Sequence, residues 1–136
     1  MLRKIEHIGI AVKDLKASNQ IFEDILGVAP YKEEQVASEH VKTSFFQVGE
    51  SKIELLQATS SDSAIAKYLE KNKEGIHHIA FDVEDIFAEI ERLKEKGYTL
   101  IHETPKAGAD GKMIAFMHPK SSGGVLIELC QDRLGE

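Results

Sequence analysis

Two histidines and two glutamates occupy equivalent positions of an internal repeat. His7 opens the phrase His-Ile-Gly-Ile-Ala-Val-Lys-Asp, and His78 opens the matching phrase His-Ile-Ala-Phe-Asp-Val-Glu-Asp. Glu54 lies in Ile-Glu-Leu-Leu-Gln, and Glu128 lies in Ile-Glu-Leu-Cys-Gln. Because a repeat of this length indicates two similar packed units, and because imidazole and carboxylate groups bind divalent metals, the pattern predicts one metal site that both halves build.

The segments around these residues alternate as half-buried strands do. His7 and His78 each share a strand face with small residues two positions on, while the opposite face is apolar and suited to packing under a helix. The same parity makes His78, and not the adjacent His77, the equivalent of His7. Glu54 and Glu128 are flanked by apolar residues of opposite parity. A carboxylate on such a face needs water, a partner or a metal.

Each half reads β-α-β-β-β. Asp14 and Asp85 are the expected N-caps of two helices that end at Gly27 and Gly97. The expected apolar stripes are Ile21, Phe22, Ile25 and Leu26 in the first helix, and Ile86, Ile90 and Leu93 in the second. The remaining strands are expected near 30–37, 41–48 and 52–57, and then at 98–101, 112–118 and 124–131. A connecting helix is expected over 61–72, with Ile65, Tyr68 and Leu69 buried.

These elements predict an α+β fold in which two pseudo-symmetric modules form a curved mixed sheet around the metal site. The 136 residues, 42% apolar, suit one domain, with module 1 about 1–61, the connecting helix about 61–72 and module 2 about 73–136. The net charge of −6 argues against nucleic acid as the main partner. The absence of a long apolar run argues against a membrane partner, and the single cysteine fits a reducing cytoplasm.

Two imidazoles and two carboxylates suit a divalent ion in an octahedral shell with two positions left for water or substrate. Co²⁺ is the expected ion, with Mn²⁺, Ni²⁺, Zn²⁺ and Fe²⁺ as alternatives. Two open positions indicate bidentate capture of a substrate with neighbouring oxygens and polarisation of its carbonyl. An adjacent C–H bond then becomes acidic because the enolate is stabilised, and a glutamate at the metal can move the proton.

The chain resembles the vicinal oxygen chelate superfamily, also called glyoxalase-like, over its full length. Within it, the chain is similar to the methylmalonyl-CoA epimerase family. The closer resemblance rests on three phrases: residues 6–12, the double-histidine phrase at 75–81, and His118-Pro119-Lys120-Ser121 running into 124–129. The His and Glu phrases are common to the whole superfamily. The double histidine and the His118-Pro119-Lys120 stretch distinguish the epimerase family better.

The resemblance implies His7, Glu54, His78 and Glu128 as metal ligands and Glu128 as an acid/base. It also implies an isomerase that interconverts (2R)- and (2S)-methylmalonyl-CoA through an enolate, an acyl-CoA substrate and a homodimer. Some relatives carry a second glutamate where this chain has Thr43 or Ser44, neither of which is a competent base without help. Glu54 or a water is the candidate for the second acid/base.

Two alternatives stay open. A glyoxalase I-type lactoylglutathione lyase would share the fold and a similar four-ligand site, and a non-catalytic binding module would have little reason to keep the full ligand set. An extradiol dioxygenase is less favoured because it uses two histidines and one carboxylate and keeps three positions open. Lys106, Lys112 and Lys120 could hold the carboxylate or CoA phosphates, although for each one a solvated turn lysine is the simpler interpretation.

Overall fold

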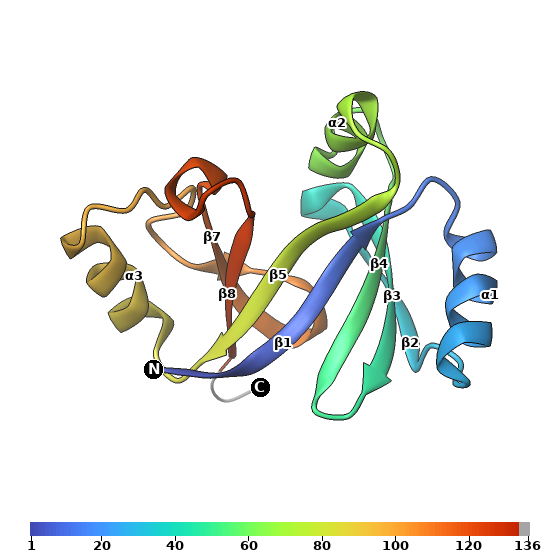
Figure 1. Cartoon of the computed structure of the whole chain (residues 1–136), viewed down its shortest axis with the longest axis horizontal. Coiled ribbons are helices and arrows are strands. Elements are labelled where there is room, and N and C mark those ends of the chain that lie inside the picture. The colour runs from blue at the N-terminus through green and yellow to red at the C-terminus, as the bar shows by residue number, and fades with distance from the viewer. Residues whose placement is uncertain (134–136) are drawn as a thin grey trace. The chain divides into compact units, whose positions relative to one another are not determined.

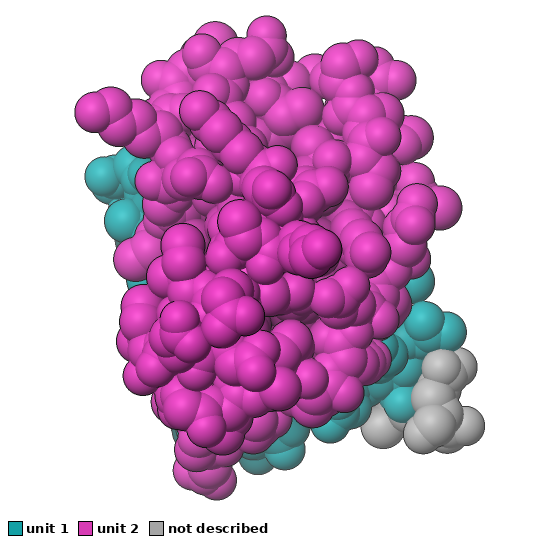
Figure 2. Space-filling view, turned by 90° about the vertical axis from the view of Figure 1, so that its right-hand side faces the viewer, with its two compact units in different colours: residues 1–6, 78–136 teal, residues 7–77 magenta. Residues whose placement is uncertain are grey.

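The computed structural model describes residues 1–133, and these fall into two compact units. Unit 1 comprises residues 1–6 and 78–136, and unit 2 comprises residues 7–77 (Figure 2). Strand β1 (Leu2–Ala11) therefore begins in unit 1 and continues in unit 2, and strand β5 (Gly75–Val83) begins in unit 2 and continues in unit 1.

In unit 2, β1 is followed by helix α1 (Leu15–Leu26) and strands β2 (Lys32–Val36), β3 (Val41–Val48) and β4 (Ser51–Ala58). The strand order is β2-β3-β4-β1, with β2, β3 and β4 antiparallel and β1 parallel to β4 (Figure 1). Helix α2 (Ala64–Lys71) follows β4 and lies inside the predicted connecting segment. The predicted order β-α-β-β-β is confirmed for the first half.

In unit 1, β5 is followed by helix α3 (Ile86–Glu95) and strands β6 (Lys106–Ala107), β7 (Lys112–Met117) and β8 (Ile127–Asp132). Their order, β5-β8-β7-β6, repeats that of unit 2: β5 is parallel to β8, and the other pairs are antiparallel. The two halves thus share one topology, and the α+β class with two pseudo-symmetric modules is confirmed.

The helix boundaries follow the predicted caps. Asp14 accepts a hydrogen bond from the backbone N–H of Ala17, and Asp85 accepts one from that of Ala88. Helix α1 ends at Gly27, whose φ of 74° is a left-handed conformation that glycine adopts without strain. Helix α3 ends earlier than expected, at Glu95, with the left-handed Gly97 two residues beyond it.

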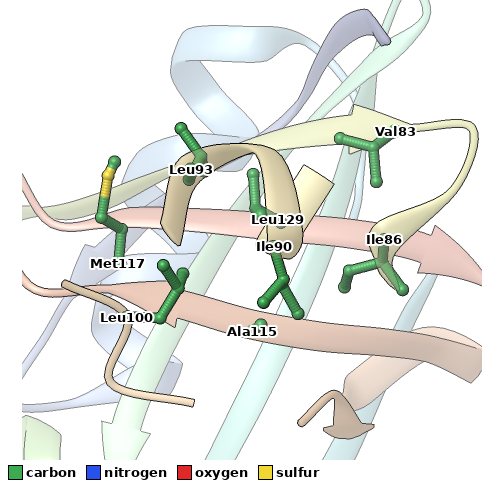
Figure 3. Close-up of a cluster of buried hydrophobic side chains, with 8 residues drawn as sticks. All are labelled: Val83, Ile86, Ile90, Leu93, Leu100, Ala115, Met117 and Leu129. Atoms are coloured by element: carbon green, nitrogen blue, oxygen red, sulfur yellow. The ribbon is translucent and has the colours of Figure 1, made fainter. Parts of the chain in front are cut away.

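The apolar stripe of α3 is as expected, because Ile86, Ile90 and Leu93 are buried against β7 and β8 (Figure 3). The stripe of α1 is partly wrong. Phe22 and Leu26 pack with Leu55 and Phe46 of the sheet, but Ile21 is 55% and Ile25 67% exposed. The core-facing side of α1 is instead Leu15, Ser18, Phe22 and Leu26, at the i, i+3, i+7 and i+11 positions of one helix face.

The predicted strand at 98–101 is also wrong. In that stretch only Leu100 forms an isolated bridge, to Met117, and the edge strand of unit 1 is the two-residue β6 at 106–107. Leu100 is nonetheless buried in the cluster under α3. Tyr98 is 43% and Ile101 48% exposed, so the apolar pattern at 98–101 reflects the burial of Leu100 alone.

Helix α2 lies on the opposite face of the unit 2 sheet from α1. Its Ile65 is buried with Ala11, Val41 and Leu56, whereas α1 packs on the face that carries Leu55. Tyr68 and Leu69 pack at the edge of the same cluster, as expected. Among residues 1–133, no helix is both long and apolar enough to cross a membrane.

Candidate metal centre and active site

The first predicted ligand pair lies within unit 2. His7 on β1 and Glu54 on β4 share one face of two parallel strands, because Gly9 lies directly opposite Glu54. The Nδ1 atom of His7 is 3.1 Å from Oε2 of Glu54, and both side chains are buried. Gly9 leaves room beside the carboxylate, as the alternation of the strand predicted.

The second pair, in unit 1, repeats this arrangement. Ala80 of β5 lies opposite Glu128 of β8, in the position that Gly9 has opposite Glu54. The Nε2 atom of His78 is 2.9 Å from Oε1 of Glu128, and both side chains are again buried. The structure therefore arranges the four predicted ligands as two His–Glu pairs, one within each unit.

The donor atoms of both pairs fit a divalent cation. Neighbouring ligands of an octahedral ion with bonds of about 2.1 Å lie roughly 3 Å apart, which is close to the two measured separations. Neutral imidazole and ionised carboxylate are ligands that first-row divalent metals accept. A buried carboxylate is also costly unless a positive group is near it, and a cation would supply that group.

An aromatic ring borders each glutamate, a feature that the sequence analysis missed. Phe45 of β3 lies opposite Glu54, and Phe116 of β7 lies opposite Glu128. The ring of Phe116 meets that of His78 edge-on, at 5.5 Å between centroids. Because aromatic rings exclude water, each carboxylate has an apolar wall on one side. The alternation of β3 and β7 alone could not show which residue lies opposite each glutamate.

Lys52 is a second residue that the sequence analysis missed. It lies two positions before Glu54 on the same face of β4, and it is only 6% exposed. Its ammonium group is 6.0 Å from the centre of the Phe45 ring, and that of Lys32 on β2 is 5.0 Å from the same ring. This face of unit 2 thus carries two ammonium groups near Phe45, of which that of Lys32 is paired with Glu34.

The glutamines that follow the ligands in the repeat have a structural role. Gln57 accepts a hydrogen bond from the backbone N–H of Leu15 at 2.6 Å, and Gln131 accepts one from that of Ile86 at 2.7 Å. Each bond links the strand that carries a glutamate to the first residue of a helix. The N–H groups of a first helical turn have no partner within the helix, so these glutamines satisfy one of them.

Thr43 and Ser44, the two residues expected to replace a glutamate of some relatives, lie on opposite faces of β3. Thr43 lies opposite Leu56 and shares the face of Glu54, whereas Ser44 lies opposite Leu55 on the face under α1. Of the two residues, Thr43 is therefore the one that shares the face of Glu54. A threonine hydroxyl is not a competent general base by itself.

The other histidines and the cysteine have packing or capping roles. The ring of His77 packs edge-on against Tyr68, and Nδ1 of His118 accepts a hydrogen bond from the backbone N–H of Lys120. His102, which showed no pattern in the sequence, accepts a hydrogen bond through Nδ1 from the backbone of Phe116. Cys130 is buried with Ala80 and Ile114.

Of the three lysines that could hold phosphates, Lys112 forms an ion pair in the structure. Its partner is Asp132, the residue opposite it on β8.

A cavity of about 360 Å³ in unit 2 lies at the start of α1, on the side away from Glu54. It is lined by residues 14–16, Asn19, Glu33, Lys42 and Gln57. None of the four predicted ligands lines it.

A family model described as the glyoxalase/bleomycin resistance protein/dioxygenase superfamily matches residues 6–116 of the chain. The protein belongs to this superfamily. The ethylmalonyl-CoA/methylmalonyl-CoA epimerase of Cereibacter sphaeroides is 41% identical over 133 residues, which cover 96% of this chain and 99% of that one. A probable lactoylglutathione lyase of Synechocystis is a more distant relative, 29% identical over 125 residues, 92% of each chain.

Solved structures of methylmalonyl-CoA epimerases are similar to this protein over nearly the whole chain. A methylmalonyl-CoA epimerase in complex with methylmalonyl-CoA and NH4+ superposes with a TM-score of 0.94 at 35% identity, covering 100% of this chain and 99% of the other. A variant of the Streptomyces coelicolor methylmalonyl-CoA epimerase, in complex with 2-nitronate-propionyl-CoA, also gives 0.94 at 35% identity, with 98% and 97% covered. The vicinal oxygen chelate fold that the family resemblance implied is confirmed.

Proposed function

We propose that this protein is a metal-dependent epimerase that interconverts (2R)- and (2S)-methylmalonyl-CoA by moving the proton at C2. The observation that carries the proposal is the buried His–Glu pair that recurs in each unit, at 3.1 Å and 2.9 Å. The epimerases among the relatives and structural neighbours match nearly the whole chain, which supports this activity over that of the more distant lyase.

His7, Glu54, His78 and Glu128 are the residues that would hold the metal, and Co²⁺ is the ion we expect. A bound divalent ion would polarise the thioester carbonyl and so make the C2 proton more acidic. Each histidine keeps its glutamate oriented, because imidazole nitrogen and carboxylate oxygen lie within 3.1 Å of each other in both pairs. The paired donors are thus already arranged before a ligand arrives.

Glu128 is the residue that we propose to take the proton from C2 of one epimer. Its carboxylate is buried, with Phe116 opposite and Ala80 on the other neighbouring strand, so one side excludes water and the other has room. Glu54 holds the equivalent position in unit 2, with Phe45 and Gly9 beside it. We propose Glu54 as the group that moves the proton on the opposite face of the substrate.

The substrate would be an anionic acyl-CoA, and the face that carries Glu54 supports this choice. Lys52 places an ammonium group beside Phe45, and the ammonium group of Lys32 near the same ring is paired with Glu34. We further expect a cytoplasmic homodimer, as the single cysteine and the family resemblance suggest. Light scattering on the purified protein would measure the number of chains directly.

Proton NMR of methylmalonyl-CoA in D₂O tests the activity. With the protein and Co²⁺, the C2 proton signal should disappear, and EDTA should stop the loss. If no divalent metal supports exchange at C2, the epimerase proposal is wrong. The glutathione hemithioacetal of methylglyoxal is then the substrate to try, because a lactoylglutathione lyase would act on it.

A further inference from the structure

Two neighbouring hydroxyl groups of β3 are buried and unpaired. Thr43 is 1% exposed and Ser44 0% exposed. Within residues 1–133, neither Oγ1 of Thr43 nor Oγ of Ser44 has a hydrogen-bond partner. Most buried polar side chains are hydrogen-bonded, so each unpaired hydroxyl needs an explanation.

The two hydroxyls differ in the face that they occupy. Ser44 shares its face with Phe46 and Leu55, which are packed under α1, so protein covers its surroundings. Thr43 shares its face with Phe45 and Glu54, on the side where the proposed chemistry takes place. Only the Thr43 hydroxyl can therefore meet a ligand bound beside Glu54.

Thr43 is also close enough to act there. Phe45 lies directly opposite Glu54, and Thr43 is two residues from Phe45 on the same strand. Such diagonal neighbours on one sheet face lie about 7–8 Å apart, a span that a small acyl group can bridge. Beyond Thr43 the face becomes apolar, since Val41 and Leu56 are buried with Ile65 of α2. On β2, Glu34 lies opposite Thr43, and its carboxylate is paired with the ammonium group of Lys32.

The repeat does not require a hydroxyl at this position. In unit 1, Phe116 lies opposite Glu128 as Phe45 lies opposite Glu54, and the residue two positions earlier is Ile114. Ile114 is buried with Cys130 and Ala80. The His–Glu pair occurs in both halves, whereas this hydroxyl occurs in one half alone, so it suits a ligand that is not symmetrical.

We propose that the Thr43 hydroxyl donates a hydrogen bond to the free carboxylate of the bound malonyl-type acyl-CoA and selects for it. This inference rests on the proposed function. A free carboxylate is the polar group that distinguishes a malonyl-type acyl-CoA from propionyl-CoA, and the ammonium group of Lys52 lies on the same face, 6.0 Å from the centre of the Phe45 ring. An acyl-CoA without the free carboxylate, such as propionyl-CoA, would gain nothing from Thr43.

Binding of two ligands to the Co²⁺-loaded protein, followed by calorimetry, tests the proposal. The ligands are methylmalonyl-CoA, as an equilibrium mixture of epimers so that no net turnover occurs, and propionyl-CoA. Thr43→Val keeps the shape of the side chain and removes the hydroxyl. Its Kd for methylmalonyl-CoA should rise about tenfold to a hundredfold, as for the loss of a hydrogen bond to a charged group, while its Kd for propionyl-CoA stays unchanged.

Two further variants separate the hydroxyl from the packing. Thr43→Ser keeps the hydroxyl and should bind methylmalonyl-CoA within a few-fold of the wild type. Ser44→Ala removes the neighbouring buried hydroxyl on the other face and should change neither Kd. In kinetics, Thr43→Val should raise KM more than it lowers kcat, because the contact is made by the bound substrate as well as in the transition state.

Equal weakening of both ligands by Thr43→Val would show a packing effect and overturn the proposal. An unchanged Kd for methylmalonyl-CoA would do the same, because the hydroxyl would then bind only water. If the wild-type protein prefers propionyl-CoA or binds neither ligand, the proposed function itself fails. That failure is visible without any variant.

Discussion

Gln131 accepts a hydrogen bond from the backbone N–H of Ile86, at 2.7 Å and in buried surroundings. The bond joins β8, which carries Glu128, to the start of α3, and Gln57 and Leu15 form the equivalent bond in the other half. The strand that holds each glutamate is therefore fixed at its far end to a helix. This link explains why glutamine belongs to the repeated phrase.

Gln131→Met should destabilise the protein, because it keeps the length of the side chain but leaves a buried N–H unpaired. The expected loss is about 1–3 kcal/mol in the free energy of unfolding, measured with urea. Gln57→Met is the matched control. Its bond is only partly buried, so water can replace the lost partner and the effect should be smaller. Equal losses in both variants would contradict this explanation.

The protein should bind one divalent ion per chain. Two His–Glu pairs could instead bind two ions, one in each unit, so the stoichiometry decides between the arrangements. Titration with Co²⁺, followed by its visible absorption and by elemental analysis, should give one equivalent. His7→Ala and His78→Ala should each abolish tight binding, because each would remove a ligand of the same ion. Retention of one tightly bound ion in either variant would favour two separate sites.

Glu128→Gln and Glu54→Gln should have different effects on the reaction. Both variants keep an oxygen donor, so elemental analysis should still find the metal. Glu128→Gln should slow deuterium exchange of one epimer at C2 by about 10²-fold or more. Glu54→Gln should leave that exchange running but slow the inversion to the other epimer by a similar factor. Inversion at the wild-type rate in Glu54→Gln would assign the second proton transfer to water or another group.

The two helices α1 and α3 should tolerate truncation differently, although both stripes look apolar in the sequence. Ile90 is 1% exposed, so Ile90→Ala should cost about 2–5 kcal/mol of stability through the cavity that it leaves (Figure 3). Ile25 is 67% exposed, so Ile25→Ala should change stability by less than about 0.5 kcal/mol. Urea unfolding of both variants gives the comparison. A large loss from Ile25→Ala would mean that another surface covers it in solution.

Much of the fold could be predicted because the signals are local. Alternation with a period of two residues identifies which side of a strand His78 occupies, and it separates His78 from His77. Aspartate caps and left-handed glycines are equally local, so Asp14, Asp85 and Gly27 marked the helix ends correctly. The candidate ligands were identified by repetition. Two histidines and two glutamates recur at equivalent positions of otherwise apolar strands, and binding a metal explains why polar residues recur there.

The cross-strand neighbour of a residue depends on the tertiary structure. Loop length and strand register determine which residues face each other, and the alternation of a single strand does not. Only the register of β3 on β4 places Phe45 beside Glu54 and gives Thr43, not Ser44, the face of the site. Only packing against the sheet decides that Phe22 is covered while Ile21, its neighbour on the helix, is exposed. The sequence by itself determined the repeat and the kinds of ligand. The tertiary structure decided their neighbours, since contacts between distant segments depend on the path of the whole chain.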